Sequence, residues 1–295
     1  MPPVSIYAPY SGLNHRSAKR FLTRQFWEAG LPFPDEDSLD LLLGLTGLSH
    51  ADYVARGTDF VSAETFDALR RAADRRLAGE PVDRILGWRE FDGRRFVIDN
   101  VLSPRGDTEV LLRAARQAVR DVPDARLLEL GTGSGALAVS LLAERPDCRV
   151  TATDLSEDAL RTAKRNADAH GVEDRLSLVR SDWFESLPGS ARFDAVLSNP
   201  PYITTDAMAR LSSEVADHDP HLALHGGADG LDPYRVIIPG ARERLMPEGW
   251  LGVEIGFDQG SPVSTLMRGS GFQDVSVLQD PAGLDRVVCG QAPSA

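Results

Sequence analysis

Four consecutive residues, Asn199, Pro200, Pro201 and Tyr202, follow the apolar run 193–197. A side-chain amide or exocyclic amine is a poor nucleophile because its nitrogen lone pair is delocalised into a neighbouring π system. Acceptors that hold its N–H groups orient it for attack, and the Asn oxygen and a Pro carbonyl can serve as those acceptors. Proline also lacks an N–H and fixes its own φ, which stiffens the loop. The motif therefore predicts methylation of a planar nitrogen, although Asn and Pro also form ordinary turns at strand ends.

A glycine-rich run lies between an apolar strand pattern and a helical pattern. Glycines let the backbone turn tightly and approach a ligand, and open α/β sheets bind ligands where a strand ends beside a helix N-terminus. The spacing also nearly meets the GxGxxG pattern of nicotinamide dinucleotide sites, with Ala136 in the third position. The residues expected at the cofactor are Glu129, Gly131, Thr132, Gly133, Ser134 and Gly135.

Acidic and aromatic residues follow the next two expected strands. Asp154 comes after the apolar run 150–153, where it can accept hydrogen bonds from ribose hydroxyls or cap the following helix. Asp182 and Trp183 follow the run 176–179, where an adenine would meet an acceptor and an aromatic wall, or where the Trp is a core residue. A glycine loop, two acidic positions and NPPY on four successive strands are typical of class I S-adenosylmethionine methyltransferases. A hydride-transfer enzyme has no use for NPPY.

The elements that would position these residues alternate along the second half of the chain. Strand and helix patterns follow one another from residue 126 to residue 289, which predicts an α/β fold with a doubly wound, mostly parallel seven-stranded sheet. The last two strands are expected to close the sheet as an antiparallel pair. We expect a helical substrate-recognition domain over residues 1–82, a β-hairpin linker with an Asp-Gly turn over 83–103, and a catalytic domain over 104–295.

Bulk composition restricts the partners. The 295 residues carry a net charge of −12, of which −10 falls in residues 126–295, so direct binding to nucleic acid is not expected. No apolar run approaches the roughly 18 residues of a membrane span, and the start has no secretory signal, so we expect a cytoplasmic protein with no membrane partner. Neither Cys148 and Cys289 nor the loop residues His218, His221 and His225 match a metal-site pattern, and no metal is expected.

Longer segments carry a more specific signal: GEPVDRILGWREFDG at 79–93, SPRGDTE at 103–109, FDAVLSNPPYI at 193–203, and EVADHDPHLALHGGADGLDPYR at 214–235. In these segments the chain resembles the HemK/PrmC family, the protein glutamine N5-methyltransferases that modify peptide chain release factors. The resemblance implies S-adenosylmethionine as donor, S-adenosylhomocysteine as product, and the glutamine of the GGQ motif of class 1 release factors as acceptor. It also implies an N-terminal helical bundle joined by a β-hairpin to the catalytic domain.

The resemblance also implies roles for individual residues. The loop 131–135, Asp154, Trp183 and Asn199 would contact the cofactor, and residues 199–202 would hold the substrate amide. Three alternatives remain at this point. A glutamine methyltransferase acting on a ribosomal protein would share every motif, an adenine N6 DNA methyltransferase would share NPPY, and a non-catalytic adaptor would keep the fold without binding S-adenosylmethionine.

Overall fold

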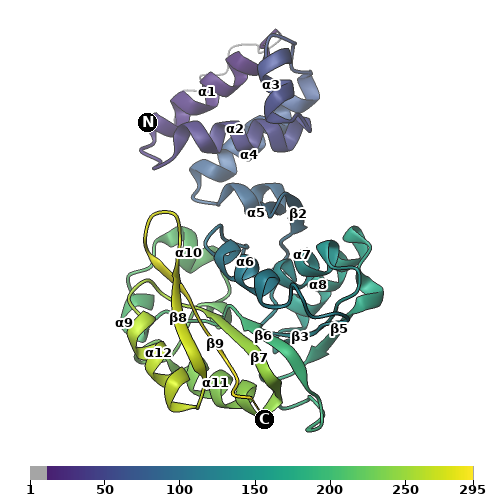
Figure 1. The fold of residues 1–295 in the computed structure, drawn as a ribbon. Coiled ribbons are helices and arrows are strands. Elements are labelled where there is room, and N and C mark those ends of the chain that lie inside the picture. Colours follow the sequence, from purple (N-terminus) through teal and green to yellow (C-terminus); the bar gives the residue numbers. More distant parts are fainter. Residues whose placement is uncertain (1–11, 295) are drawn as a thin grey trace. The chain divides into compact units, whose positions relative to one another are not determined.

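The computed structural model describes residues 12–294, which divide after Gly87 into two compact units (Figure 1). The first unit is helical, with an apolar core formed by Leu22, Phe26, Leu41 and Leu69 among others. Side-chain oxygens of the residues that precede α1, α3 and α4 accept backbone N–H groups, which defines where these helices begin. The described helices of this unit are α1 (His15–Glu28), α2 (Pro34–Thr46), α3 (His50–Arg56), α4 (Ala63–Leu77) and α5 (Val82–Leu86).

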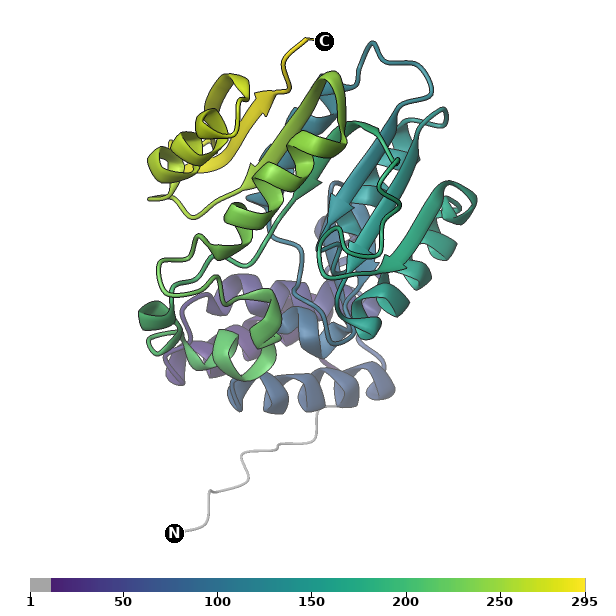
Figure 2. The same cartoon turned by 90° about the horizontal axis from the view of Figure 1, so that it is seen from below.

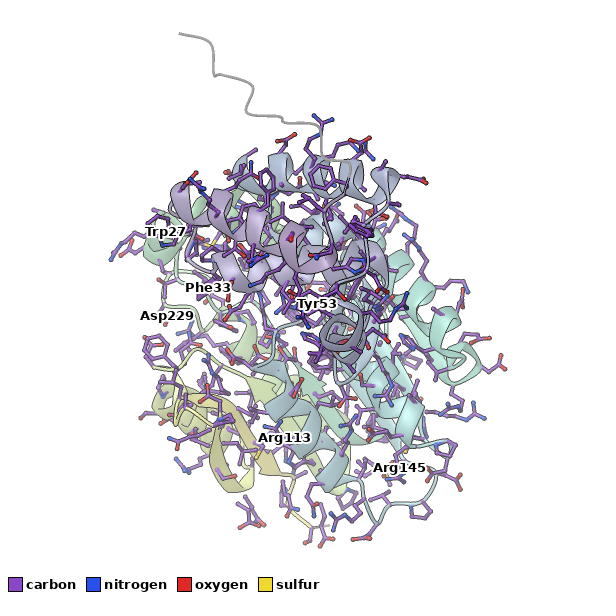
Figure 3. The ribbon with its side chains drawn as sticks, turned by 90° about the horizontal axis from the view of Figure 1, so that it is seen from above. Trp27, Phe33, Tyr53, Arg113, Arg145 and Asp229 are labelled. Carbon is purple, nitrogen blue, oxygen red and sulfur yellow. The ribbon has the colours of Figure 1, made fainter. Side chains whose placement is uncertain are left out.

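Helical geometry separates buried from exposed aromatic residues in this unit. Phe26 is fully buried, whereas its neighbour Trp27 is 72% exposed, because adjacent residues of a helix point about 100° apart. Phe33, just before α2, is also exposed (Figure 3). None of the helices described between residues 12 and 294 is long and apolar enough to cross a membrane.

The second unit is built on a seven-stranded sheet in the order β5-β4-β3-β6-β7-β9-β8. Pairs along the sheet from β5 to β7 are parallel, and β9 runs antiparallel to both of its neighbours. The expected α/β sheet and its antiparallel closing pair are therefore confirmed. The strands are β3 (Arg126–Leu130), β4 (Arg149–Asp154), β5 (Leu176–Arg180), β6 (Phe193–Ser198), β7 (Leu245–Glu254), β8 (Gln273–Gln279) and β9 (Asp285–Gln291).

Helices cover both faces of this sheet (Figure 2). Leu127 packs in one apolar cluster with residues of three helices, α6 (Thr108–Ala118), α7 (Ala136–Glu144) and α8 (Glu157–His170). Leu128 packs in the other cluster with α11 (Asp232–Arg244) and α12 (Gly260–Gly269), because successive strand residues point to opposite faces. The short helices α9 (Thr205–Met208), η2 (His221–Ala223) and α10 (Ser213–His218) lie between β6 and α11 in sequence, and η1 (Glu173–Arg175) precedes β5.

A β-hairpin opens the second unit, formed by β1 (Trp88–Phe91) and β2 (Arg94–Val97). Asp92 and Gly93 have φ values of 52° and 68°, as a tight Asp-Gly hairpin turn requires. The side chain of Asn166 on α8 accepts from the Val97 N–H at 2.8 Å and donates to the Val97 carbonyl at 3.0 Å. These hydrogen bonds fix the hairpin to α8 within the second unit. The range expected as a linker, 83–103, also contains most of α5, which lies in the first unit.

Candidate active site

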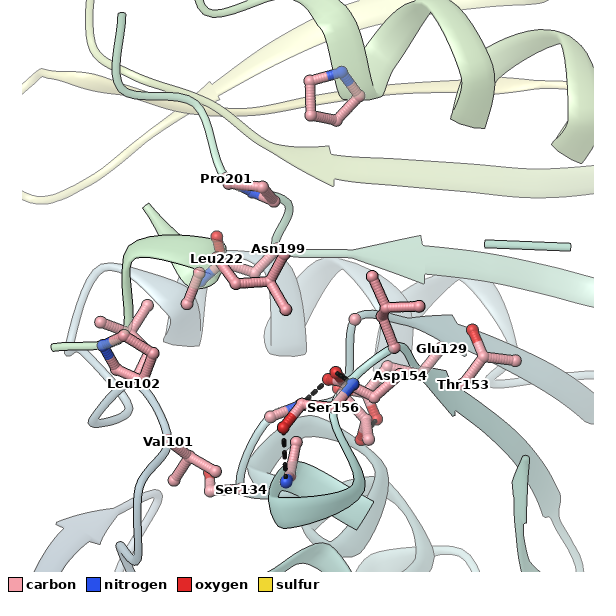
Figure 4. A pocket seen from close by; sticks show the side chains of 18 of the residues that line it. Val101, Leu102, Glu129, Ser134, Thr153, Asp154, Ser156, Asn199, Pro201 and Leu222 are labelled. Atoms are coloured by element: carbon pink, nitrogen blue, oxygen red, sulfur yellow. Dashed lines mark hydrogen bonds between the residues drawn. The ribbon is translucent and has the colours of Figure 1, made fainter. Parts of the chain in front are cut away.

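A cavity of about 540 Å³ lies where strands β3, β4 and β6 end, within the second unit (Figure 4). Its size is in the range of ~300–1,000 Å³ that small-ligand sites occupy. Asp154 and Ser156 lie on one side of it and Asn199 and Leu222 on the other. The predicted site residues that line it are Glu129, Gly131, Thr132, Gly133, Ser134, Asp154, Asp182, Trp183, Asn199 and Pro201. The lining does not include the predicted residues Gly135, Pro200 and Tyr202.

The backbone of the glycine loop requires glycine at three positions. Gly131, Gly133 and Gly135 have φ values of 70°, 55° and 78°, a region that L side chains rarely adopt. A Cβ on Gly135 would also lie 3.0 Å from the Cβ of Ala163 on α8. Gly135 therefore permits close packing of the loop on α8, while the rest of the loop lines the cavity.

The carboxylate of Asp154 holds the glycine loop in place. One oxygen accepts from the Gly133 N–H at 2.9 Å, and the other accepts from the Ser156 N–H at 2.9 Å. The residue that caps α8 is Ser156, whose hydroxyl accepts from the Ala159 N–H at 3.2 Å. Burial raises the pKa of Asp154 above its ordinary value. A carboxylate has about four lone-pair positions, so Asp154 retains acceptor capacity for a ligand hydroxyl in the cavity.

Glu129 also holds the glycine loop, through hydrogen bonds that its side chain accepts. It is 2% exposed, and its carboxylate accepts from the Thr132 hydroxyl at 2.8 Å and from the Ala138 N–H at 3.2 Å. Burial raises the pKa of Glu129 to about 8. Glu129 therefore orders the loop backbone as well as lining the cavity.

Trp183 adopts an uncommon backbone conformation next to the glycine loop. Its φ is 44°, and left-handed backbone is rare for a bulky residue and is often found at binding sites. A Cβ at Gly131 would lie 3.8 Å from the indole, so the ring packs beside the loop. Asp182 is exposed at the cavity and Trp183 is partly buried.

The NPPY residues follow β6 and divide between the cavity and the protein interior. The side-chain nitrogen of Asn199 donates to the Thr108 hydroxyl at 3.2 Å. Pro200 is buried, and Pro201 lines the cavity. The ring of Tyr202 packs against the apolar cluster of α11 and α12, away from the cavity lining. Burial raises the pKa of Tyr202.

Residues far from NPPY in sequence hold its backbone. The side chain of Gln259 donates to the carbonyls of Tyr202 (3.1 Å) and Gly230 (3.2 Å). Its oxygen accepts from the Gly256 N–H at 2.9 Å. A Cβ on Gly230 would lie 2.4 Å from the Tyr202 carbonyl oxygen, and one on Gly226 would lie 2.7 Å from the Tyr202 Cα. The GGADGL glycines thus let one loop pack directly on the other.

Sequence reasoning assigned no role to Thr108 or Gln259. Thr108 lies in SPRGDTE and contacts Asn199, whereas Gln259 lies outside every motif that the sequence analysis used. The GGADGL segment marks the family resemblance, and the sequence alone does not indicate its contact with NPPY. Nothing in the local spacing of either residue indicates a contact with NPPY, since the Thr108 contact needs α6 to pack beside the end of β6 and Gln259 follows β7, the neighbour of β6 in the sheet.

An ion pair connects two segments that line the cavity. Arg105 donates to Asp219 at 2.9 Å, and these residues are adjacent to the lining residues Pro104 and Pro220. His225 also lines the cavity and lies 2.9 Å from the Thr205 hydroxyl. Among the residues that the structure describes, no group of three or more His, Cys, Asp or Glu residues is placed to hold a metal ion.

The sheet order and a cavity between a glycine loop and NPPY define a class I S-adenosylmethionine-dependent methyltransferase. Two family models match the chain, the methyltransferase small domain over residues 106–223 and the PrmC N-terminal domain over residues 17–87. Among solved structures, the catalytic domain of hMettl16 aligns with a TM-score of 0.54 at 17% identity, over 66% of this chain and 75% of that one. At this identity the likeness shows the fold alone.

Curated relatives show the family. The release factor glutamine methyltransferase of Cereibacter sphaeroides is 45% identical over 90% of this chain and 94% of its own length. That of Agrobacterium fabrum is 43% identical, over 88% of this chain and 91% of its own length. The chain therefore belongs to the release factor glutamine methyltransferase family.

Proposed function

We propose that this enzyme methylates the side-chain amide N5 of the glutamine in the GGQ motif of class 1 peptide chain release factors, with S-adenosylmethionine as donor, in the cytoplasm. The observation that carries the proposal is one cavity lined by both the glycine loop and the NPPY residues Asn199 and Pro201. The names of the curated relatives support the substrate. The acidic charge of residues 126–295 favours a protein acceptor over duplex DNA.

The residues on the Asp154 side fit the donor. Glycines at 131 and 133 allow a ligand close to the backbone, and the carboxylate of Asp154 has capacity for ribose hydroxyls. Trp183 beside Gly131 offers an aromatic surface for adenine. When bound, S-adenosylmethionine supplies an electrophilic methyl group on a sulfonium. Glu129 keeps the loop in the conformation that binds it.

On the NPPY side, the side-chain oxygen of Asn199, which lines the cavity, would accept one amide hydrogen of the substrate glutamine, and the carbonyl of Pro200, a residue outside the lining, is predicted to accept the other. Both N–H groups are then held, and the nitrogen lone pair is oriented for in-line attack on the methyl carbon. The two acceptors also stabilise the positive charge that develops on nitrogen. The nitrogen becomes acidic only as the new N–C bond forms, so no strong base is required. That Pro201 and Tyr202 shape the slot for the amide stays a prediction.

Mass spectrometry of a class 1 release factor tests the proposal. After incubation with enzyme and S-adenosylmethionine, we expect one added methyl group on the GGQ glutamine. A release factor with alanine in place of that glutamine is the control and should gain no methyl group. Methylation of a ribosomal protein or of adenine in duplex DNA, in preference to the release factor, would replace the proposed acceptor.

A further inference from the structure

A buried carboxyl group lies behind the NPPY loop and outside the lining of the cavity. Glu254 ends β7 and is 2% exposed. Because Ser198 pairs with Val253 across the two parallel strands, Asn199 and Glu254 are the next residues along neighbouring strands. Within residues 12–294, the buried Oε2 atom of Glu254 has no hydrogen-bond partner. A buried polar atom without a partner is costly.

Several elements face this carboxyl group. Thr108 of α6 and Asn199 lie near it as potential donors and lower its pKa, as does the charge of Arg286 on β9, whereas Asp107 raises it. Burial is the largest influence, and the pKa of Glu254 is raised to about 7. The two remaining neighbours, Tyr202 and Tyr234, have pKa values raised by burial and by the Glu254 charge, so both stay neutral near pH 7.

The arginine near Glu254 keeps its charge over this pH range. Arg286 forms ion pairs with Asp107 at 3.0 Å and with Asp280 at 2.8 Å. A guanidinium stays protonated at any pH a protein tolerates. Among the groups that face Glu254, the Glu254 carboxyl is therefore the one expected to change charge near pH 7.

The protonation state of this carboxyl determines whether the nitrogen or the oxygen of the Asn199 side-chain amide is favoured beside it. An ionised carboxylate only accepts hydrogen bonds, so it favours the amide NH₂ and the Thr108 hydroxyl proton. The Asn199 nitrogen already donates to Thr108 at 3.2 Å, which leaves the hydroxyl proton for another acceptor. A protonated Glu254 carries a donor and can instead attract the Asn199 oxygen, the atom that the substrate amide needs.

We propose that Glu254 is a positioning residue that acts through Thr108 to keep the side-chain oxygen of Asn199 available to the substrate amide. The proposal rests on the role given to Asn199 in the proposed function. Only the ionised carboxylate enforces this orientation. Turnover is therefore expected to rise with pH through about 7 and then to level off.

A spectroscopic experiment tests the coupling without any substrate. Carboxyl carbons of glutamate and the side-chain amide of Asn199 are followed by NMR in the full-length protein from pH 5.5 to 8.5, with assignments from Glu254→Gln and Asn199→Ala. We expect the Glu254 carboxyl to titrate near pH 7, separately from Glu129 near pH 8, and the Asn199 NH₂ signals to move with the Glu254 titration. Thr108→Val should weaken that coupling, and Thr108→Ser should retain it. The proposal would be overturned if the chemical shifts of the Asn199 side-chain amide did not change as Glu254 titrates.

Kinetics provide the second readout, measured as kcat at saturating S-adenosylmethionine, so that a change in donor affinity does not enter. Glu254→Gln should lower kcat about 10-fold at pH 7.5 and abolish its rise through pH 7, with the KM for donor changed less than about 3-fold. Exposed Glu243 on α11 gives the matched control, Glu243→Gln, with a wild-type profile. A wild-type profile in Glu254→Gln contradicts the proposal. If Glu254→Gln does not fold, Thr108→Val and Thr108→Ser supply the same comparison.

The two proposals fail in different ways. If the wild-type enzyme does not methylate a release factor but Asn199 still follows the Glu254 titration, the proposed function fails and the positioning role stands. If the release factor is methylated but neither the NMR coupling nor the pH dependence is found, Glu254 is a structural residue and the proposed function stands.

Discussion

The residues on the two sides of the cavity are held by contacts that differ in sequence separation. On the donor side, Glu129, Thr132, Gly133 and Asp154 bond to one another or to close neighbours, all within residues 129–156. On the NPPY side, Asn199 and the residues after it are held from Thr108, Gly226, Gly230 and Gln259. The side-chain contacts of the glycine loop come mostly from nearby sequence, with added support from Ala163 and Asn166 on α8, whereas the NPPY residues are supported by more distant parts of the chain.

This difference teaches where mutations should act. Substitutions on the donor side are expected to change donor affinity, because they alter a loop that folds from contiguous sequence. Substitutions around NPPY are expected to change turnover even when they lie far from it in sequence, because a small displacement of reacting groups is costly. The comparison would be contradicted by donor-side substitutions that lower turnover without changing donor affinity, or by substitutions around NPPY that change donor affinity and leave turnover unchanged.

The largest effect is expected from Asn199→Ala. It removes the acceptor assigned to the substrate amide, and loss of one preorganised polar contact costs ~10²–10³-fold in kcat. Donor affinity should change little, because Asp154 and the glycine loop hold the donor from the other side. Single-turnover kinetics and calorimetry with S-adenosylmethionine measure the two quantities. Unchanged turnover would remove Asn199 from the mechanism.

The next largest effect is expected from Gly230→Ala. Its Cβ would come within 2.4 Å of the Tyr202 carbonyl and 2.6 Å of the Gln259 nitrogen, so the NPPY loop has to move. We expect kcat to fall ~10–10²-fold. Gly283→Ala is the control, because Gly283 has a similar φ of 83° but no atom within 4 Å of an added Cβ. Equal losses in both variants would mean that backbone strain, and not displacement of NPPY, is the cause.

Asp154→Asn tests the donor side. It keeps the size of the side chain but places an amide where two backbone N–H groups and a ribose need acceptors. The Kd for S-adenosylmethionine should rise about 10-fold, in line with the loss of a charge-assisted hydrogen bond, with kcat at saturation nearly unchanged. Exposed Asp168, which pairs with Lys164 on α8, gives the control Asp168→Asn. Calorimetry that finds an unaltered Kd would leave Asp154 with the loop-holding role alone.

The same difference in sequence separation between contacts explains which features could be predicted from the sequence. The sheet and the Asp-Gly hairpin follow from hydrophobic periodicity and turn residues, which are local properties, and the structure confirms both. The residues around Gly131 and Asp154 form a motif that can be read in one stretch. Gln259 could not be found in this way, because its hydrogen bonds to the carbonyls of Tyr202 and Gly230 join segments that are far apart in sequence. Similarly, the position of the Tyr202 ring depends on how α11 packs.

The smallest effect is expected from Arg105→Gln, which removes the ion pair between the 103–107 and 219–225 segments. The Arg105 side chain is 48% exposed, whereas that of Asp219 is 6% exposed, so solvent screens the pair from the Arg105 side. The KM for the release factor should therefore rise no more than about 3-fold, without a change in kcat. Arg113→Gln is the control, because Arg113 is exposed on α6 and its ion pair, with Glu109 one turn away, is 3.7 Å long.

A double-mutant cycle with Asp219→Asn measures the coupling within that pair. If the ion pair positions the two segments, the double variant should resemble Arg105→Gln alone, and added salt should narrow the difference from wild type. A large fall in kcat would place this pair among the contacts that position NPPY. In that case the contacts that support the NPPY side extend to the surface of the enzyme. The side of the cavity that is hardest to predict from sequence is then also the side whose activity is most sensitive to substitutions of distant residues.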